Sequence, residues 1–147
     1  MNITNSISFS GDGLPNSPQI LAENIKNLPK IEDINPDSYS IGGIVGELEL
    51  KFSSIFNKEK SIFLPTGTLA NHLAIRELAG VNSKVIVPEQ SHIYQDSGDT
   101  LQSLSGINLI PAGINAPCYD LNELEEIIHK NNISRVPKKI GCIVVES

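Results

Sequence analysis

Two stretches of the chain place apolar residues at helical spacing. In the first, they recur every three or four positions and would share one face of a helix that ends near Phe56. In the second, the spacing predicts a helix over residues 69–78 that stops at Gly80. The apolar residues that recur in the helix ending near Phe56 are Val45, Leu48, Phe52 and Ile55. Prolines break up residues 1–40, which we expect to form an irregular arm with only a short amphipathic stretch at 20–28.

Short apolar runs alternate with helical segments and are predicted to be strands. The runs at 84–87 and 107–110 have the length of single strands. The run at 140–145 is rich in β-branched residues and long enough for a strand that is covered on both faces. A further short, buried strand is expected at 61–64. Strands that alternate with helices predict an α/β fold with a mainly parallel sheet.

Two more segments are expected to be helical. Residues 93–104 have helical character, although Ser97 and Gly98 weaken it. Asp120 followed by Glu123 resembles a capping box, which opens a helix. The apolar face of that helix would consist of Leu121, Leu124, Ile127 and Ile128.

Composition and charge narrow the class of protein. The 147 residues are 39% hydrophobic, which suits one globular domain with a core. A formal charge of −6 argues against nucleic-acid or anionic-membrane binding over the whole surface. No apolar run reaches the ~18 residues of a membrane span and no cationic leader is present, so we expect a cytoplasmic protein. Cys118 and Cys142 lack zinc or redox-motif spacing and are expected in the core.

The segment Leu64–Asn71 combines a strand end, a tight glycine turn at 65–68 and a helix start. This geometry aims backbone N–H groups and the positive end of the helix at an anion. Gly67 allows close approach, and Thr68 could cap the helix and donate its hydroxyl to a phosphate oxygen. An ordinary threonine cap without a ligand explains the same pattern. No GxxxxGK[ST] motif is present, and Ile41–Gly46 lacks the first glycine of GxGxxG, which argues against a dinucleotide fold.

His92 follows a predicted strand by a short loop, so we expect it at the same carboxyl edge of the sheet as Gly67. There it could stack on or hydrogen-bond a ligand, and Asp96, four residues later, could fix its tautomer. A solvated ion pair in a surface turn is an equally good interpretation. His72 and His129 fall in predicted helices and are expected to be core or surface residues. These residue types and spacings assemble no metal site.

Several short motifs, taken together, resemble those of a known enzyme family. They are Tyr39 with Val45–Glu49, then Pro65–Asn71, Ser91–Tyr94 and Leu104–Gly106. Their order and spacing are similar to those of the threonine aldolase and aromatic amino acid β-eliminating lyase family, over most of the chain from Phe9 onward. This family belongs to the pyridoxal-phosphate-dependent enzymes of the aspartate-aminotransferase-like fold, which is fold type I.

The resemblance implies a partial fold type I large domain at residues 41–147, preceded by the arm at 1–40. It implies pyridoxal 5'-phosphate as the cofactor, with Gly67 and Thr68 binding its phosphate. His92 would stack on the pyridine ring and act as a catalytic residue in proton transfer. Asp12, by a looser match, would lie on the substrate side.

The resemblance also implies a lyase that acts on a small amino acid, by Cα–Cβ cleavage of a β-hydroxy amino acid or by β-elimination. The complete protein would be a homo-oligomer without nucleic-acid or membrane partners. The chain departs from the family at Tyr39–Gly42, where an acidic group is missing, and at Ser97 and Asp99, which replace the usual glutamate and glycine. The substrate preference therefore stays open.

The family's Schiff-base lysine, and the aspartate that pairs with the pyridine nitrogen, come after the strand that ends at Glu146. None of Lys58, Lys60 or Lys84 occupies the matching place. We therefore expect a fragment that does not turn over substrate by itself. Two alternatives stay open. One is a catalytically inactive, truncated chain that only associates with a partner subunit. The other is a nucleotide- or phosphate-binding α/β module that uses Gly67.

Overall fold

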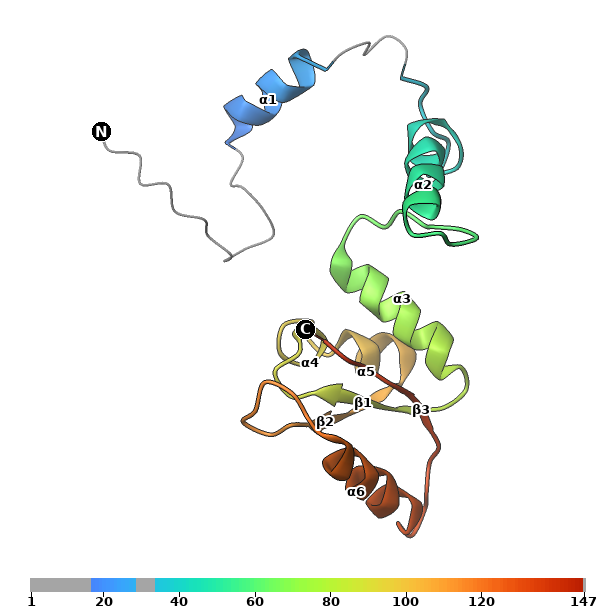
Figure 1. Ribbon diagram of the computed structural model, residues 1–147, viewed down its shortest axis with the longest axis vertical. Coiled ribbons are helices and arrows are strands. Elements are labelled where there is room, and N and C mark those ends of the chain that lie inside the picture. The colour runs from blue at the N-terminus through green and yellow to red at the C-terminus, as the bar shows by residue number, and fades with distance from the viewer. Residues whose placement is uncertain (1–16, 29–33, 147) are drawn as a thin grey trace, which may run out of the picture. The chain divides into compact units, whose positions relative to one another are not determined.

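The computed structural model describes residues 17–28 and 34–146, and the chain divides into two compact units between Phe63 and Leu64 (Figure 1). The predicted boundary after residue 40 lies within the first unit and stays a prediction about the family's large domain. Among the described residues, no helix has the length and apolar character needed to cross a bilayer.

The described part of the first unit contains two helices, α1 (Pro18–Lys26) and α2 (Gly43–Ile55). Both helical stretches predicted in this part of the chain are confirmed. α2 starts at Gly43, where φ is +51° and an added Cβ would lie 2.4 Å from the carbonyl oxygen of Pro36. Only glycine fits such a position. Neither helix buries a residue fully within the described chain.

Residues 61–64 do not form the buried strand that the sequence predicts. The Phe63 amide donates a hydrogen bond to the Glu49 carboxylate of α2 at 2.8 Å, and the Ile62 side chain is 78% exposed. Since a helix side chain satisfies this backbone donor, the segment lies along α2. No described strand pairs with it.

The second unit is built on a parallel sheet of three strands in the order β2-β1-β3. The strands are β1 (Lys84–Pro88), β2 (Asn108–Ala112) and β3 (Ile140–Ile143). The predicted α/β fold with a parallel sheet is therefore confirmed.

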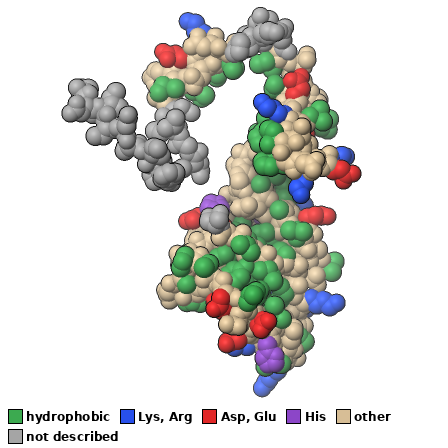
Figure 2. Space-filling model, in the orientation of Figure 1, with side chains coloured by type: hydrophobic (Ala, Val, Ile, Leu, Met, Phe, Trp, Pro, Cys, Tyr) green, Lys and Arg blue, Asp and Glu red, His purple; other side chains and the backbone are tan. Residues whose placement is uncertain are grey.

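Helices lie on both faces of this sheet (Figure 1). α3 (Gly67–Ala79), α4 (His92–Gln95) and α5 (Thr100–Ser105) lie on one face, and α6 (Leu121–Asn132) lies on the other. Further apolar side chains gather at the surface of this unit (Figure 2). The buried core between the sheet and helices α3, α4 and α5 consists of Ile75, Ala79, Val85, Val87, Ile93, Leu101 and Ile107.

Three expectations about the second unit are wrong. Residues 93–104 form two short helices, because the chain turns through positive φ at Gly98 and Asp99. The run at 140–145 is not covered on both faces: a hollow of about 460 Å³ lies between α6 and β3, and Ile143 is 42% exposed. Cys118 is exposed in the loop before α6, whereas Cys142 packs against the core.

α6 begins at the predicted cap. The Asp120 carboxylate accepts a hydrogen bond from the Glu123 amide at 2.9 Å. The reciprocal bond of a capping box is not formed, because the Glu123 carboxylate accepts from the Gly113 amide at 2.7 Å instead. Leu121 is 76% exposed, so the half-buried face is Leu124, Ile127 and Ile128.

Candidate functional site

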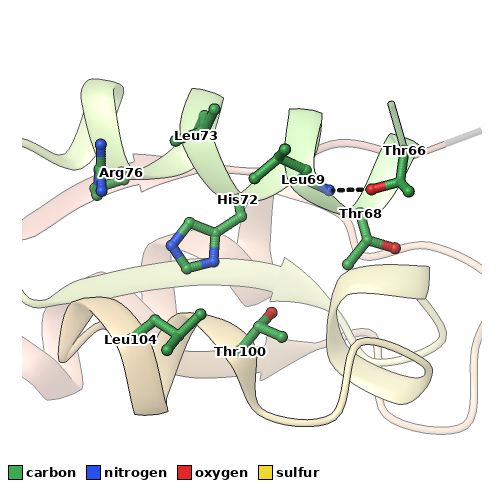
Figure 3. A pocket seen from close by; sticks show the side chains of 8 residues that line it. All are labelled: Thr66, Thr68, Leu69, His72, Leu73, Arg76, Thr100 and Leu104. Atoms are coloured by element: carbon green, nitrogen blue, oxygen red, sulfur yellow. Dashed lines mark hydrogen bonds between the residues drawn. The ribbon is translucent and has the colours of Figure 1, made fainter. Parts of the chain in front are cut away.

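The start of α3 presents backbone donors. Thr66, and not Thr68 as predicted, caps the helix, because its hydroxyl oxygen accepts from the Leu69 amide at 3.1 Å (Figure 3). Gly67 and Thr68 are therefore the first two helical residues, and their amides have no intrahelical acceptor. Nothing lies within 4 Å of a Cβ added to Gly67. An anion can thus approach both N–H groups directly.

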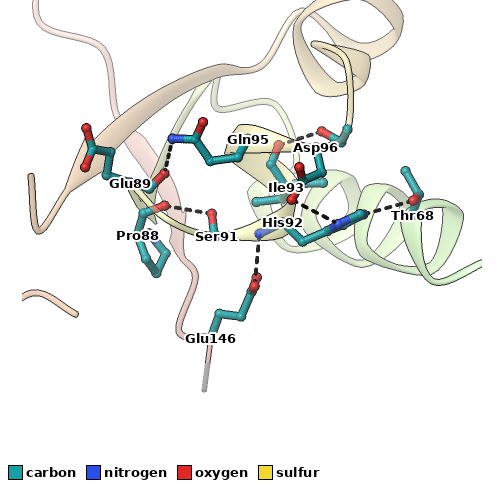
Figure 4. Close-up of polar contacts among 10 residues, drawn as sticks. Thr68, Pro88, Glu89, Ser91, His92, Ile93, Gln95, Asp96 and Glu146 are labelled. Carbon is teal, nitrogen blue, oxygen red and sulfur yellow. Dashed lines mark hydrogen bonds and ion pairs between the residues drawn. The ribbon is translucent and has the colours of Figure 1, made fainter. Parts of the chain in front are cut away.

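His92 lies at the same edge of the sheet as this helix start, as predicted. Its Nε2 atom is 3.1 Å from the Thr68 hydroxyl oxygen (Figure 4). α4 follows β1 by a short turn in which the Ser91 hydroxyl donates to the Pro88 carbonyl at 2.7 Å. This turn places His92 at the first position of the helix. The His92 side chain is 44% exposed, so part of the ring is available to a ligand.

Two carboxylates flank His92 (Figure 4). The predicted proximity of Asp96 is confirmed, with its Oδ2 atom 3.7 Å from Nδ1 of the ring. Glu146, which follows β3, accepts a hydrogen bond from the His92 backbone amide at 2.9 Å. Three elements thus converge on one histidine: the start of α3, α4 itself and the segment after β3.

A cavity of about 450 Å³ opens beside His92. α3 contributes Asn71, and the chain from Cys142 to Glu146 contributes another wall. Burial raises the pKa of the Cys142 thiol, which favours its neutral form. The volume lies within the roughly 300–1,000 Å³ of small-molecule sites.

A second cavity, of about 360 Å³, lies between α3 and α5 (Figure 3). The His72 ring points toward it and lies 2.8 Å from the Ser105 hydroxyl through Nε2. His72 is only 6% exposed, which confirms its placement in the core. His129 is exposed on α6, as expected for a surface residue.

Asp12, predicted on the substrate side, lies outside the described residues, so its role stays a prediction. Glu146 and Asn71 lie around His92 but were not predicted from the sequence. The rule that sites form at the carboxyl ends of parallel strands points to Glu146, which follows the last strand. Asn71 is one turn after Thr68, on a helix already predicted.

The parallel sheet, the flanking helices and the edge where α3 meets His92 define a class of protein. They form part of a fold type I large domain. The chain belongs to the beta-eliminating lyase family, which it matches over residues 33–147.

Two solved structures share this fold. A proposed L-allo-threonine aldolase from Listeria monocytogenes superposes with a TM-score of 0.70 at 23% identity, over 90% of this chain and 34% of that one. A proposed aromatic amino acid beta-eliminating lyase/threonine aldolase from Exiguobacterium also has a TM-score of 0.70, at 24% identity, with the same coverage of 90% and 34%.

An uncharacterised protein of Caenorhabditis elegans is 25% identical over 111 residues, which are 75% of this chain and 27% of that protein. The chain thus spans about a quarter of this curated relative and about a third of each solved relative.

Proposed function

We propose that the chain forms the phosphate-binding and ring-contacting side of a pyridoxal-phosphate-dependent lyase active site. The contact between the Thr68 hydroxyl and the His92 ring carries this proposal, because it joins a helix start with free donors to a titratable side chain. Membership of the beta-eliminating lyase family supports the same assignment.

The residues present fit the cofactor. The amides of Gly67 and Thr68 would hold the phosphate, since the space around Gly67 is open. The exposed part of the His92 ring would lie against the pyridine ring. His92 also lines a cavity large enough for an amino acid. When bound, pyridoxal phosphate supplies an electron-withdrawing ring that stabilises negative charge on the substrate's α-carbon.

The reaction we propose is cleavage of a small amino acid, either of the Cα–Cβ bond of a β-hydroxy amino acid or of a bond to a β-substituent. The first needs a base for the β-hydroxyl proton, and the second an acid for the leaving group. His92 Nε2 holds or takes a proton in either case. Asp12 stays our proposed substrate-side residue.

The isolated chain is proposed to be inactive. Within the described part of the chain, no lysine lines the cavity beside His92. The Lys84 ammonium donates to Asn131 Oδ1 at 2.7 Å, and Lys84 begins β1, whereas His92 follows the other end of that strand. The lysine that bonds the cofactor covalently is therefore proposed to lie outside the residues that line this cavity.

Binding of pyridoxal phosphate to Thr68 and Thr100 variants tests the proposal. In equilibrium dialysis at pH 6, Thr68→Val should weaken binding about tenfold, because a hydrogen bond to a charged group contributes about 1.5 kcal/mol or more. Thr100→Val is the matched control, since its hydroxyl is buried and has no partner among the described residues. Equal binding by Thr68→Val and the unmodified chain would contradict the proposed site.

A second role, association with a partner subunit, is favoured by α1 and α2. Both helices carry large apolar side chains, yet neither has a fully buried residue in the described chain. Leu50 and Ile55, for example, are 73% and 61% exposed. Exposed apolar surface of this kind marks association sites. Light scattering tests this role, which predicts a dimer or larger species; a monomer at high concentration would contradict it.

A further inference from the structure

The Thr68 hydroxyl has one hydrogen, and two acceptors compete for it. One acceptor is Nε2 of His92, at 3.1 Å. The other is the phosphate proposed for the start of α3. Because a hydroxyl donates only one hydrogen bond, the protonation of Nε2 decides which acceptor receives it.

Asp96 lies at the opposite nitrogen of the same ring. Its Oδ2 atom is 3.7 Å from Nδ1, one helical turn after His92 (Figure 4). A carboxylate beside one imidazole nitrogen favours the proton on that nitrogen. In the neutral ring, Nε2 then carries the lone pair and accepts the Thr68 hydrogen.

We propose that Asp96 is a positioning residue that holds the His92 ring proton on Nδ1, and that anion binding at the start of α3 is coupled to uptake of one proton at Nε2. This inference rests on the proposed function, which places a phosphate at Gly67 and Thr68. The proton comes from solvent. Nε2–H then donates to the Thr68 oxygen, and the Thr68 hydrogen turns to the anion, so that no covalent bond other than N–H forms.

The charges that face His92 come from three elements. Asp96 lies on the same helix, Glu146 follows β3 and accepts from the His92 amide, and α3 presents its positive end. No described lysine or arginine lines the cavity, and its one thiol, Cys142, stays neutral because burial raises its pKa. Two of the groups that face His92 are carboxylates, and the third is the positive end of a helix, which a bound anion would neutralise.

Because the His92 and Asp96 side chains are exposed, a positioning role of Asp96 can be measured apart from an effect on stability. The side chains of His92 and Asp96 are 44% and 69% exposed, so their attraction adds little to folding. Asp96→Asn should therefore leave the melting temperature within about 3 °C. A positioning role acts instead on the ring proton, which NMR observes directly.

The ¹⁵N NMR spectrum of the His92 ring, recorded on the full chain, tests the tautomer. The unmodified chain should show Nδ1–H, and Asp96→Asn should shift the population toward Nε2–H. Asp99→Asn is the matched control, because it removes the same charge from an exposed carboxylate that, among the described residues, accepts only from Gln102, at 3.3 Å. An Nε2–H ring in the unmodified chain, or an unchanged ring in Asp96→Asn, overturns the positioning role.

Titration with inorganic sulfate, whose charge does not change near neutral pH, tests the coupling. Sulfate should shift the Gly67 and Thr68 amide resonances, with an affinity that falls about tenfold per pH unit above the His92 transition. The fall should persist in Thr68→Ser and become shallower in Thr68→Val. A pH-independent affinity overturns the coupling and leaves the anion site standing. Failure of sulfate to shift either amide at any pH overturns the anion site and the proposed function as well.

Discussion

Gly141 of β3 lies directly against Ala79 of α3. A Cβ added there would lie 2.6 Å from the Cα atom of Ala79 and 2.8 Å from its Cβ and carbonyl oxygen. Because non-bonded carbon atoms prefer about 3.5–4.0 Å, Gly141→Ala has to move the helix and the strand apart by about 1 Å. Overpacking of this kind costs about 1–3 kcal/mol of unfolding free energy. For a unit of the size of Leu64–Ser147, each kcal/mol of lost unfolding free energy lowers the melting temperature by roughly 4–8 °C.

Urea denaturation followed by circular dichroism measures this cost. Gly46→Ala is the matched control, because nothing lies within 4 Å of its added Cβ and the residue is helical. The double variant Gly141→Ala with Ala79→Gly should recover only part of the loss, because the Cα and carbonyl oxygen of residue 79 stay in place. An unchanged urea midpoint for Gly141→Ala, or full recovery in the double variant, would refute the packing argument.

Three further predictions concern single side chains. In a full-length enzyme that carries this sequence, His92→Ala should lower kcat far more than the melting temperature; normal turnover with altered melting would make the residue structural. Tyr119→Phe should lose about 1 kcal/mol in urea denaturation, because the Tyr119 hydroxyl donates to the Val144 carbonyl at 2.7 Å, and no change would show that water replaces this bond. Hydrogen bonds from the Asn115 amide and, to a smaller extent, from the Gln90 side chain hold the pKa of Glu89 below its ordinary value of 4.5. These hydrogen bonds therefore stabilise the folded chain above that pH, and their contribution is lost as the pH falls. Glu89→Gln should therefore flatten the acid side of the stability profile, and an identical profile would contradict the assignment.

Local patterns predicted most of the elements in the second unit. The helix at 69–78 and the strand at 84–87 follow from spacing and β-branched composition, and both are confirmed. The strand predicted from the apolar run at 61–64 is wrong, because a backbone amide of this run donates a hydrogen bond to a side chain of α2. Hydrophobic periodicity does not reveal such a partner. The capping residue was also misplaced by two positions, since Thr66 and Thr68 are equally good caps by type.

The candidate site was partly predictable for a similar reason. Gly67, Thr68 and His92 stand at the ends of predicted elements, and parallel strands bring such ends to one edge. The contact from Glu146 to the His92 amide joins residues 54 positions apart, and its register depends on how β3 pairs with β1. Sequence patterns specify the ends of strands, whereas the pairing of distant strands sets which side chains meet there.

A crystal structure of this chain with pyridoxal 5'-phosphate tests the central claim most directly. The phosphate should lie within hydrogen-bond distance of the Gly67 and Thr68 amides, and the pyridine ring should lie against His92. A phosphate bound elsewhere on the chain, or a pyridine ring out of contact with His92, would contradict it.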